Sequence, residues 1–97
     1  DISKGKMFLG MKRYEEALSC FSKACKKNPM NGEAWYFKGV TLARLKKESE
    51  ALECFNHLLL YDPENVQALL EKGIILGDQD DHYAALSCFD VATELQP

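Results

Sequence analysis

Residues 32–63, GEAWYFKGVTLARLKKESEALECFNHLLLYDP, contain the pattern that decides the fold, because their spacing recurs on both sides. In this stretch Gly39, Ala51, Phe55 and Pro63 each have an identical residue 34 positions earlier and 34 positions later. The same step relates Lys4, Lys38 and Lys72, then Leu18, Leu52 and Leu86, then Cys20, Cys54 and Cys88. A period of this size is typical of stacked-repeat proteins, in which each unit buries its apolar face against its neighbours.

Each unit is predicted to form two antiparallel helices, which in the central repeat cover residues 33–45 and 48–61. Asn31 and Asn65 precede first helices, where a side-chain oxygen can accept a free helical N–H. Pro29, Pro63 and Pro97 follow second helices, because proline lacks the N–H that would continue them. The second helix of the central repeat has a wide apolar stripe at helical spacing: Ala51, Leu52, Phe55, Leu58 and Leu59.

The residues at the period also resemble those of tetratricopeptide repeats. The pattern W-x2-L-G-x2-Y…A-x3-F…P is matched by Trp35, Gly39, Leu42, Ala51, Phe55 and Pro63. Lys38 stands where the family has Leu, and Leu42 where it has Tyr. The tryptophan position is Asp1 in the first repeat and Leu69 in the third.

The resemblance implies an all-α fold, a right-handed α-solenoid of three helix-turn-helix units with six antiparallel helices. We expect one domain over residues 1–97, with repeats at about 1–31, 32–65 and 66–97. The first repeat is interpreted as N-terminally truncated, and the chain as a fragment of a longer protein. The implied function is a non-catalytic scaffold that binds a peptide or helix of a partner protein.

In this family the first helices of the repeats line a concave groove that holds the ligand. The resemblance therefore implies a groove with an apolar and aromatic centre and charges of both signs at its rim. Its predicted lining is Ile2, Lys6 and Leu9 from repeat 1, Glu33, Tyr36, Phe37, Val40 and Arg44 from repeat 2, and Gln67, Leu70, Glu71, Ile74 and Asp78 from repeat 3. The alternative is that Tyr36, Phe37 and Leu70 are core residues covered by flanking helices.

Members that bind the C-terminal tails of heat-shock chaperones use a carboxylate clamp of Lys, Asn, Asn, Lys and Arg. The corresponding positions here are Ile2, Lys6, Phe37, Gln67 and Glu71. None of the five matches, and Glu71 has the opposite charge to the family's arginine. A clamp for chaperone tails is therefore not expected.

The net charge of −3 is spread unevenly along the chain. Residues 1–31 carry seven Lys or Arg against three Asp or Glu, a net +4; residues 32–65 carry −2 and residues 66–97 carry −5. One explanation is a slice of a longer array whose surface charge drifts. The other is head-to-tail self-association of a basic N-terminal face with an acidic C-terminal face through uncapped ends.

The four cysteines are interpreted as buried thiols of a reducing, cytoplasmic compartment. Cys20, Cys54 and Cys88 occupy equivalent places on successive repeats, too far apart for a disulfide, which needs Cα atoms within about 7 Å. Cys20 and Cys25 are expected on different faces of one helix. There is no C-x-x-C motif, and no cofactor or metal is expected.

Other classes of function find little support in the sequence. No phosphate-binding loop, H-E-x-x-H or G-x-S-x-G motif is present, so an enzyme is not expected. His82 beside Asp80 and Asp81 is interpreted as a solvated turn. The pI of about 5.3 disfavours nucleic acid, and no apolar run approaches the ~18 residues of a membrane span. A regulatory segment of a larger multidomain enzyme remains an alternative.

Overall fold

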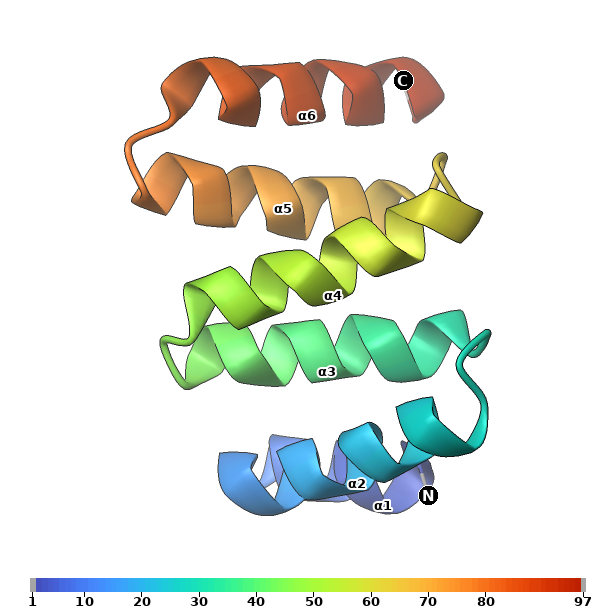
Figure 1. Ribbon diagram of the computed structural model, residues 1–97. Helices are drawn as coiled ribbons and strands as arrows, with labels where there is room; N and C mark the ends of the chain where they lie inside the picture. Colours follow the sequence, from blue (N-terminus) through green and yellow to red (C-terminus); the bar gives the residue numbers. More distant parts are fainter. Residues whose placement is uncertain (1, 97) are drawn as a thin grey trace.

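The computed structural model describes residues 2–96, which form six helices joined by short turns (Figure 1). Asp1, aligned above with the tryptophan position, and Pro97, expected to follow the last helix, lie outside the described residues. No strand occurs between residues 2 and 96. The helices are α1 (Ile2–Gly10), α2 (Tyr14–Lys27), α3 (Gly32–Arg44), α4 (Glu48–Tyr61), α5 (Val66–Asp78) and α6 (His82–Leu95).

Side-chain caps define where the later repeats begin, as the sequence predicts. The Asn31 side chain accepts a hydrogen bond from the N–H of Ala34 at 3.2 Å, and Asn65 accepts one from Ala68 at 2.9 Å. Each cap satisfies one of the N–H groups that a helix start leaves without a partner. The helix α3 therefore runs from Gly32 to Arg44, one residue earlier at both ends than expected.

The turn inside each helix pair has the same backbone geometry in all three repeats. Lys12, Lys46 and Asp80, which are 34 positions apart, have φ values of 61°, 64° and 64°. In the first repeat, the N–H of Arg13 donates to the carbonyl oxygen of Phe8 at 2.8 Å, and equivalent bonds close the other two turns. This left-handed ending satisfies helix carbonyls that otherwise lack a donor. Non-glycine residues occupy the left-handed position in every repeat.

A glycine and a phenylalanine hold each helix pair together. A Cβ atom added to Gly39 would lie 2.7 Å from the ring of Phe55, so only a glycine permits the observed approach. The same holds for Gly5 against Phe21, at 2.6 Å, and for Gly73 against Phe89, at 2.8 Å. Phe21 and Phe55 are completely buried. The 34-residue period of Gly and Phe is therefore the period of one repeated packing contact.

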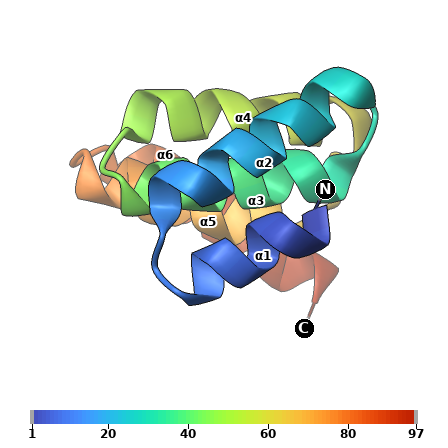
Figure 2. The same ribbon diagram turned by 90° about the horizontal axis from the view of Figure 1, so that it is seen from below.

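The helix pairs stack in series with a consistent inner and outer side. The first helices of the pairs approach one another, α1 with α3 and α3 with α5, whereas within the described residues α2, α4 and α6 do not. In Figure 2, α2 and α4 lie toward one side of the stack and α1 toward the other. The array therefore curves with α1, α3 and α5 on its concave face.

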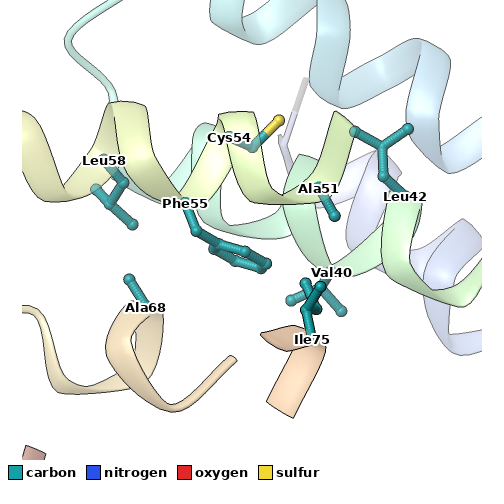
Figure 3. Packing of buried hydrophobic residues seen from close by; sticks show 8 residues of the cluster. All are labelled: Val40, Leu42, Ala51, Cys54, Phe55, Leu58, Ala68 and Ile75. Carbon is teal, nitrogen blue, oxygen red and sulfur yellow. The ribbon is translucent and has the colours of Figure 1, made fainter. Parts of the chain in front are cut away.

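The main core lies where the second repeat meets the third. Figure 3 shows Phe55 and Leu58 directed from α4 toward Ala68 of α5, with Val40 and Ile75 side by side. Phe55 thus packs on Gly39 of its own repeat and shares a cluster with the next one. The buried set in this cluster is Val40, Leu42, Ala51, Cys54, Phe55, Leu58, Ala68 and Ile75.

The last helix is less covered than its equivalents. Leu86 of α6 is exposed, as expected for an uncapped end, whereas Leu18 and Leu52 are half-buried. Leu95, at the C-terminal end of the same helix, is half-buried. Of the helices between residues 2 and 96, none combines the length and apolar character that crossing a membrane requires.

Replacing Phe55 with alanine should destabilise the chain more than the equivalent change at Phe89. Phe55 is fully buried and Phe89 is half-buried. The side chains around Phe55 are therefore less able to collapse into the cavity, and water is less able to fill it. We expect Phe55→Ala to lower the free energy of unfolding by about 3–5 kcal/mol. Urea denaturation of both variants measures this, and equal losses would contradict the burial difference.

Gly39→Ala and Gly10→Ala should have opposite effects on stability. At Gly39 the new methyl group would meet the Phe55 ring, and overpacking of this kind costs about 1–3 kcal/mol. At Gly10 a Cβ meets nothing within 4 Å, so the gain in helix propensity, up to about 1 kcal/mol, should prevail. Thermal melts compare the two, and a stabilised Gly39→Ala would show that this close approach is not required.

Candidate functional site

The residues that the resemblance assigns to the groove all lie on the first helices of the three pairs. Ile2 is considered below; of the other twelve, two lie on α1, and α3 and α5 carry five each. On α5 their spacing of three and four residues places them on one side of the helix. The residues are Lys6 and Leu9; Glu33, Tyr36, Phe37, Val40 and Arg44; Gln67, Leu70, Glu71, Ile74 and Asp78.

On α5 the candidate site is an exposed apolar strip between polar residues. Leu70 is 40% exposed and Ile74 is 52% exposed, which is high for aliphatic side chains in a helix that packs on both neighbours. Asp78 is exposed and Glu71 half-buried on the same side of the helix. Leu70 is thus not covered by flanking helices, contrary to the alternative stated for it above.

On α3 two aromatic side chains, Tyr36 and Phe37, lie at the boundary between the core and the concave face. Phe37 stacks on Phe21 of α2, with ring centroids 5.6 Å apart. Tyr36 meets Phe37 edge to face at 5.2 Å and lies 6.1 Å from Phe55. Both Tyr36 and Phe37 are half-buried. Each ring therefore contributes to internal packing while part of it stays accessible to water, so both interpretations from the sequence apply to part of each side chain.

Three of the predicted residues interact with one another between α1 and α3. The ammonium group of Lys6 forms an ion pair with Glu33, with Nζ 2.9 Å from Oε2. The same ammonium lies 5.0 Å from the centroid of the Phe37 ring, within the range of a cation–π contact. This pair links the first repeat to the second, and it already neutralises the charge of Lys6.

Two hollows lie along this face, and both are lined by Phe37. The α1–α3 hollow, of about 440 Å³, is bounded by Lys6, Leu9, Gly10, Lys12, Tyr14, Phe37, Val40 and Arg44. The α3–α5 hollow, of about 320 Å³, is bounded by Gly32, Glu33, Tyr36, Phe37, Asn65 and Gln67. Val40 is nearly buried and belongs to the core cluster, so it can contribute only to the floor.

The structure differs from the predicted lining at its N-terminal end. Ile2 does not line either hollow; it faces a separate depression beside Lys23 and Lys27 of α2. Conversely, Gly10, Lys12 and Tyr14 line the α1–α3 hollow and were missed. None of the three belongs to the family pattern matched in the sequence, although Lys12 lies at the turn position that Lys46 and Asp80 occupy in the other repeats.

Charges of both signs act on the Tyr36 hydroxyl. Burial raises the pKa of Tyr36, the nearby Glu71 carboxylate raises it further, and the Arg44 guanidinium partly opposes them. Because these groups come from α3 and α5, the three side chains share one electrostatic environment. Charged groups of α3 and α5 therefore act on the same hydroxyl group.

The four cysteines differ in burial, and the prediction that they are buried holds for two of them. All four are free thiols, and Cys25 and Cys54 are buried whereas Cys20 and Cys88 are half-buried. Burial raises the pKa of Cys54 to about 12, with Lys38 opposing the shift, so this thiol stays protonated and unreactive near neutral pH. Across the part of the chain that the structure describes, no group of three or more His, Cys, Asp or Glu residues is arranged to hold a metal ion.

The opposite side of α3 carries an aromatic cluster that the sequence did not reveal. The rings of Trp35 and His57 lie 4.0 Å apart, and Tyr61 meets His57 at 5.2 Å. The indole N–H of Trp35 donates to the carbonyl oxygen of Pro29 at 2.8 Å. These contacts join the end of one repeat to the next. Their polar and aromatic groups already have partners within the chain, so the cluster is explained by packing.

Comparison with known proteins places this geometry among helical repeats. The profile of the tetratricopeptide repeat family matches residues 8–73. The structure is similar to the first TPR of Spaghetti (RPAP3) bound to the HSP90 peptide SRMEEVD, with a TM-score of 0.95 and 22% identity over 99% of this chain and 76% of that chain. Because a mirror-image array would not superimpose, the solenoid of this chain winds in the same right-handed sense as that structure.

Two further similar structures are longer than this chain. MamA 41-end from Desulfovibrio magneticus RS-1 has a TM-score of 0.92 and 24% identity, over 97% of this chain and 53% of that chain. MamA AMB-1 has a TM-score of 0.88 and 25% identity, over 95% of this chain and 54% of that chain. The chain thus spans about half the length of the MamA chains that it matches. A search of curated protein sequences finds no significant match.

Neutralising Glu71 should lower the pKa of Tyr36, and neutralising Arg44 should raise it. In Glu71→Gln the pKa should remain above its ordinary value of 10.0, because burial is the larger cause. Asp78→Asn removes the same charge elsewhere on α5 and serves as the matched control. NMR titration of ring-labelled tyrosine resolves Tyr36 from the other three. A pKa unchanged in Glu71→Gln would contradict the proximity of these two side chains.

Proposed function

Because the chain belongs to the tetratricopeptide repeat family, we propose that it is a non-catalytic scaffold that binds a peptide or helix of a partner protein along its concave face. The residues proposed to make the contact are the twelve described on α1, α3 and α5. The three repeats over residues 1–97 act in this proposal as one binding domain.

The observation that carries the proposal is the exposed apolar strip of α5 beside two hollows that meet at Phe37. Leu70 and Ile74 are exposed to water in the free chain, and covering them with a partner would remove apolar area at roughly 25 cal/mol per Å². The hollows offer places for side chains of the ligand. Such an arrangement suits a segment that inserts apolar anchors at intervals, as amphipathic helices and extended peptides do.

The specificity of the Spaghetti structures is not extended to this chain. Those domains hold the HSP90 peptide SRMEEVD, in which three of the last four residues are acidic. Of the five clamp positions, only Lys6 is basic here, and its charge is paired with Glu33. The half-buried Glu71 would repel a carboxylate at its position. We therefore propose that the partner is recognised by other contacts.

Self-association is the second candidate, and two observations favour it. Tyr83 and Leu86 of α6 are 90% and 59% exposed, so this helix offers an apolar surface to a second copy. The first repeat carries a net +4 and the third −5, so the two ends would attract. Sedimentation velocity of the isolated chain tests this, and a salt-sensitive oligomer that disappears in Leu86→Glu would support it.

Selection from a displayed library of random peptides of about twelve residues tests the groove. We expect the native chain to select peptides whose binding is lost in Leu70→Glu/Ile74→Glu. Both residues are exposed, so the variant should keep its fold, which circular dichroism and melting verify. The matched control is Leu60→Glu/Val91→Glu, which changes two aliphatic residues exposed on second helices. Peptides lost only in the control would move the binding surface to the convex side.

A further inference from the structure

We propose that the α1–α3 hollow is a pocket for an acidic segment of the partner protein. A carboxylate of that segment would lie between Lys12 and Arg44, and a neighbouring apolar side chain would pack on Phe37 and Val40. The inference rests on the proposed function, since it assigns one chemistry to one part of the proposed groove.

The hollow is lined by three cations and by no carboxylate, and in the described part of the chain only one of these cations forms an ion pair. The three cations are Lys6, Lys12 and Arg44. Lys6 is paired with Glu33, but neither Lys12 nor Arg44 takes part in any ion pair or hydrogen bond of its side chain between residues 2 and 96. By contrast Arg13, next to Lys12, is bound by both oxygens of Glu16. Two cations that form no ion pair among the described residues therefore line the same hollow, although the Glu71 carboxylate acts on the same Tyr36 hydroxyl as Arg44 does.

The attraction of a cation to the C-terminal end of a helix does not by itself explain why Lys12 and Arg44 line the same hollow. Arg44 is the last residue of α3, and Lys12 follows the end of α1, where a cation is favoured by the helix dipole. Lys46 has the same position in the next repeat and the same left-handed backbone, with φ of 64° against 61° for Lys12. Lys46 does not line this hollow. The dipole is common to both lysines, whereas the hollow and the second cation are specific to Lys12.

The floor of the hollow strengthens an ionic contact made there. Phe37 and Leu9 are half-buried, and Val40 is almost fully buried. A ligand carboxylate at the rim would be partly removed from water once an apolar neighbour covered this floor. Ion pairs that are partly desolvated contribute more than pairs in open solvent. The pocket therefore favours an acidic residue adjacent to an apolar one over an isolated acidic residue.

The preference for an acidic residue of the ligand is restricted to the surface between α1 and α3. One period later, Glu71 stands in place of Phe37 and Asp78 in place of Arg44. The surface next to α5 therefore repels the group that the α1–α3 hollow attracts. This charge difference orients the ligand, with its acidic part over α1 and α3 and a neutral or basic part over α5. Charge complementarity of this kind fixes the register of a bound segment.

The experiment extends the peptide selection described above with charge variants of the native chain. Lys12→Asp is compared with Lys46→Asp: both remove one lysine at a left-handed turn position, and Asp80 shows that aspartate occupies that position in the third repeat. Arg44→Asp provides an independent second variant. Dissociation constants are measured for the selected peptides and for versions in which each Asp or Glu is changed to Lys.

We expect the selected peptides to contain Asp or Glu beside an apolar residue. Their affinity should fall about tenfold in Lys12→Asp and in Arg44→Asp, and less than about twofold in Lys46→Asp. The Lys-substituted peptides should bind the Asp variants better than the native chain, a readout that a general loss of stability cannot produce.

The other outcomes separate the two proposals. If peptides are lost in Leu70→Glu/Ile74→Glu but show no acidic preference and bind Lys12→Asp normally, the acidic pocket is wrong and the groove remains. If no selected peptide depends on the concave face, both proposals fail. If the affinity falls equally in Lys12→Asp and Lys46→Asp, the effect is one of net charge, and the pocket is again wrong.

Discussion

The contact of a glycine with a phenylalanine sixteen residues later is the constraint on which the structure depends. It occurs as Gly5 with Phe21, Gly39 with Phe55, and Gly73 with Phe89, and in each case a Cβ atom would lie within 3 Å of the ring. Because the ring occupies the space of a missing side chain, the two helices can approach closely. The left-handed turn at Lys12, Lys46 or Asp80 then brings the chain back in the same way in each repeat.

This local contact also determines which side of the array is available to a partner. With the phenylalanines directed inward from the second helices, the first helices approach one another and form the concave face. The aromatic rings of Phe21, Phe37, Tyr36 and Phe55 then connect the core to that face. Changes at Tyr36 or Phe37 would consequently affect packing as well as binding. The residues on which binding can be examined separately from stability are the exposed ones, such as Arg44, Leu70 and Ile74.

The fold could be predicted from the sequence because the residues that determine it are the ones that recur. Gly39, Ala51 and Phe55 identify the packing, and Asn31 and Asn65 cap helices as expected. The candidate site could be predicted only in outline, because its residues differ from repeat to repeat and periodicity carries no information about them. The inclusion of Lys12 in a hollow and the pairing of Lys6 with Glu33 depend on distances between α1 and α3 that no sequence pattern specifies.

The nearest-neighbour character of the packing has a kinetic consequence. Every close approach of helices joins elements that are adjacent or next to adjacent along the chain, so little loop entropy opposes their formation and folding can begin in any repeat. The middle of the array is the most protected, since α3 and α4 hold most of the main core, whereas Gly5 is the one buried residue of α1 among those described. The first helix should therefore open and reclose most readily, with rapid exchange of its amide hydrogens. A segment bound across α1 and α3 would slow that opening, so that occupancy of the pocket would also set the local stability of the first repeat.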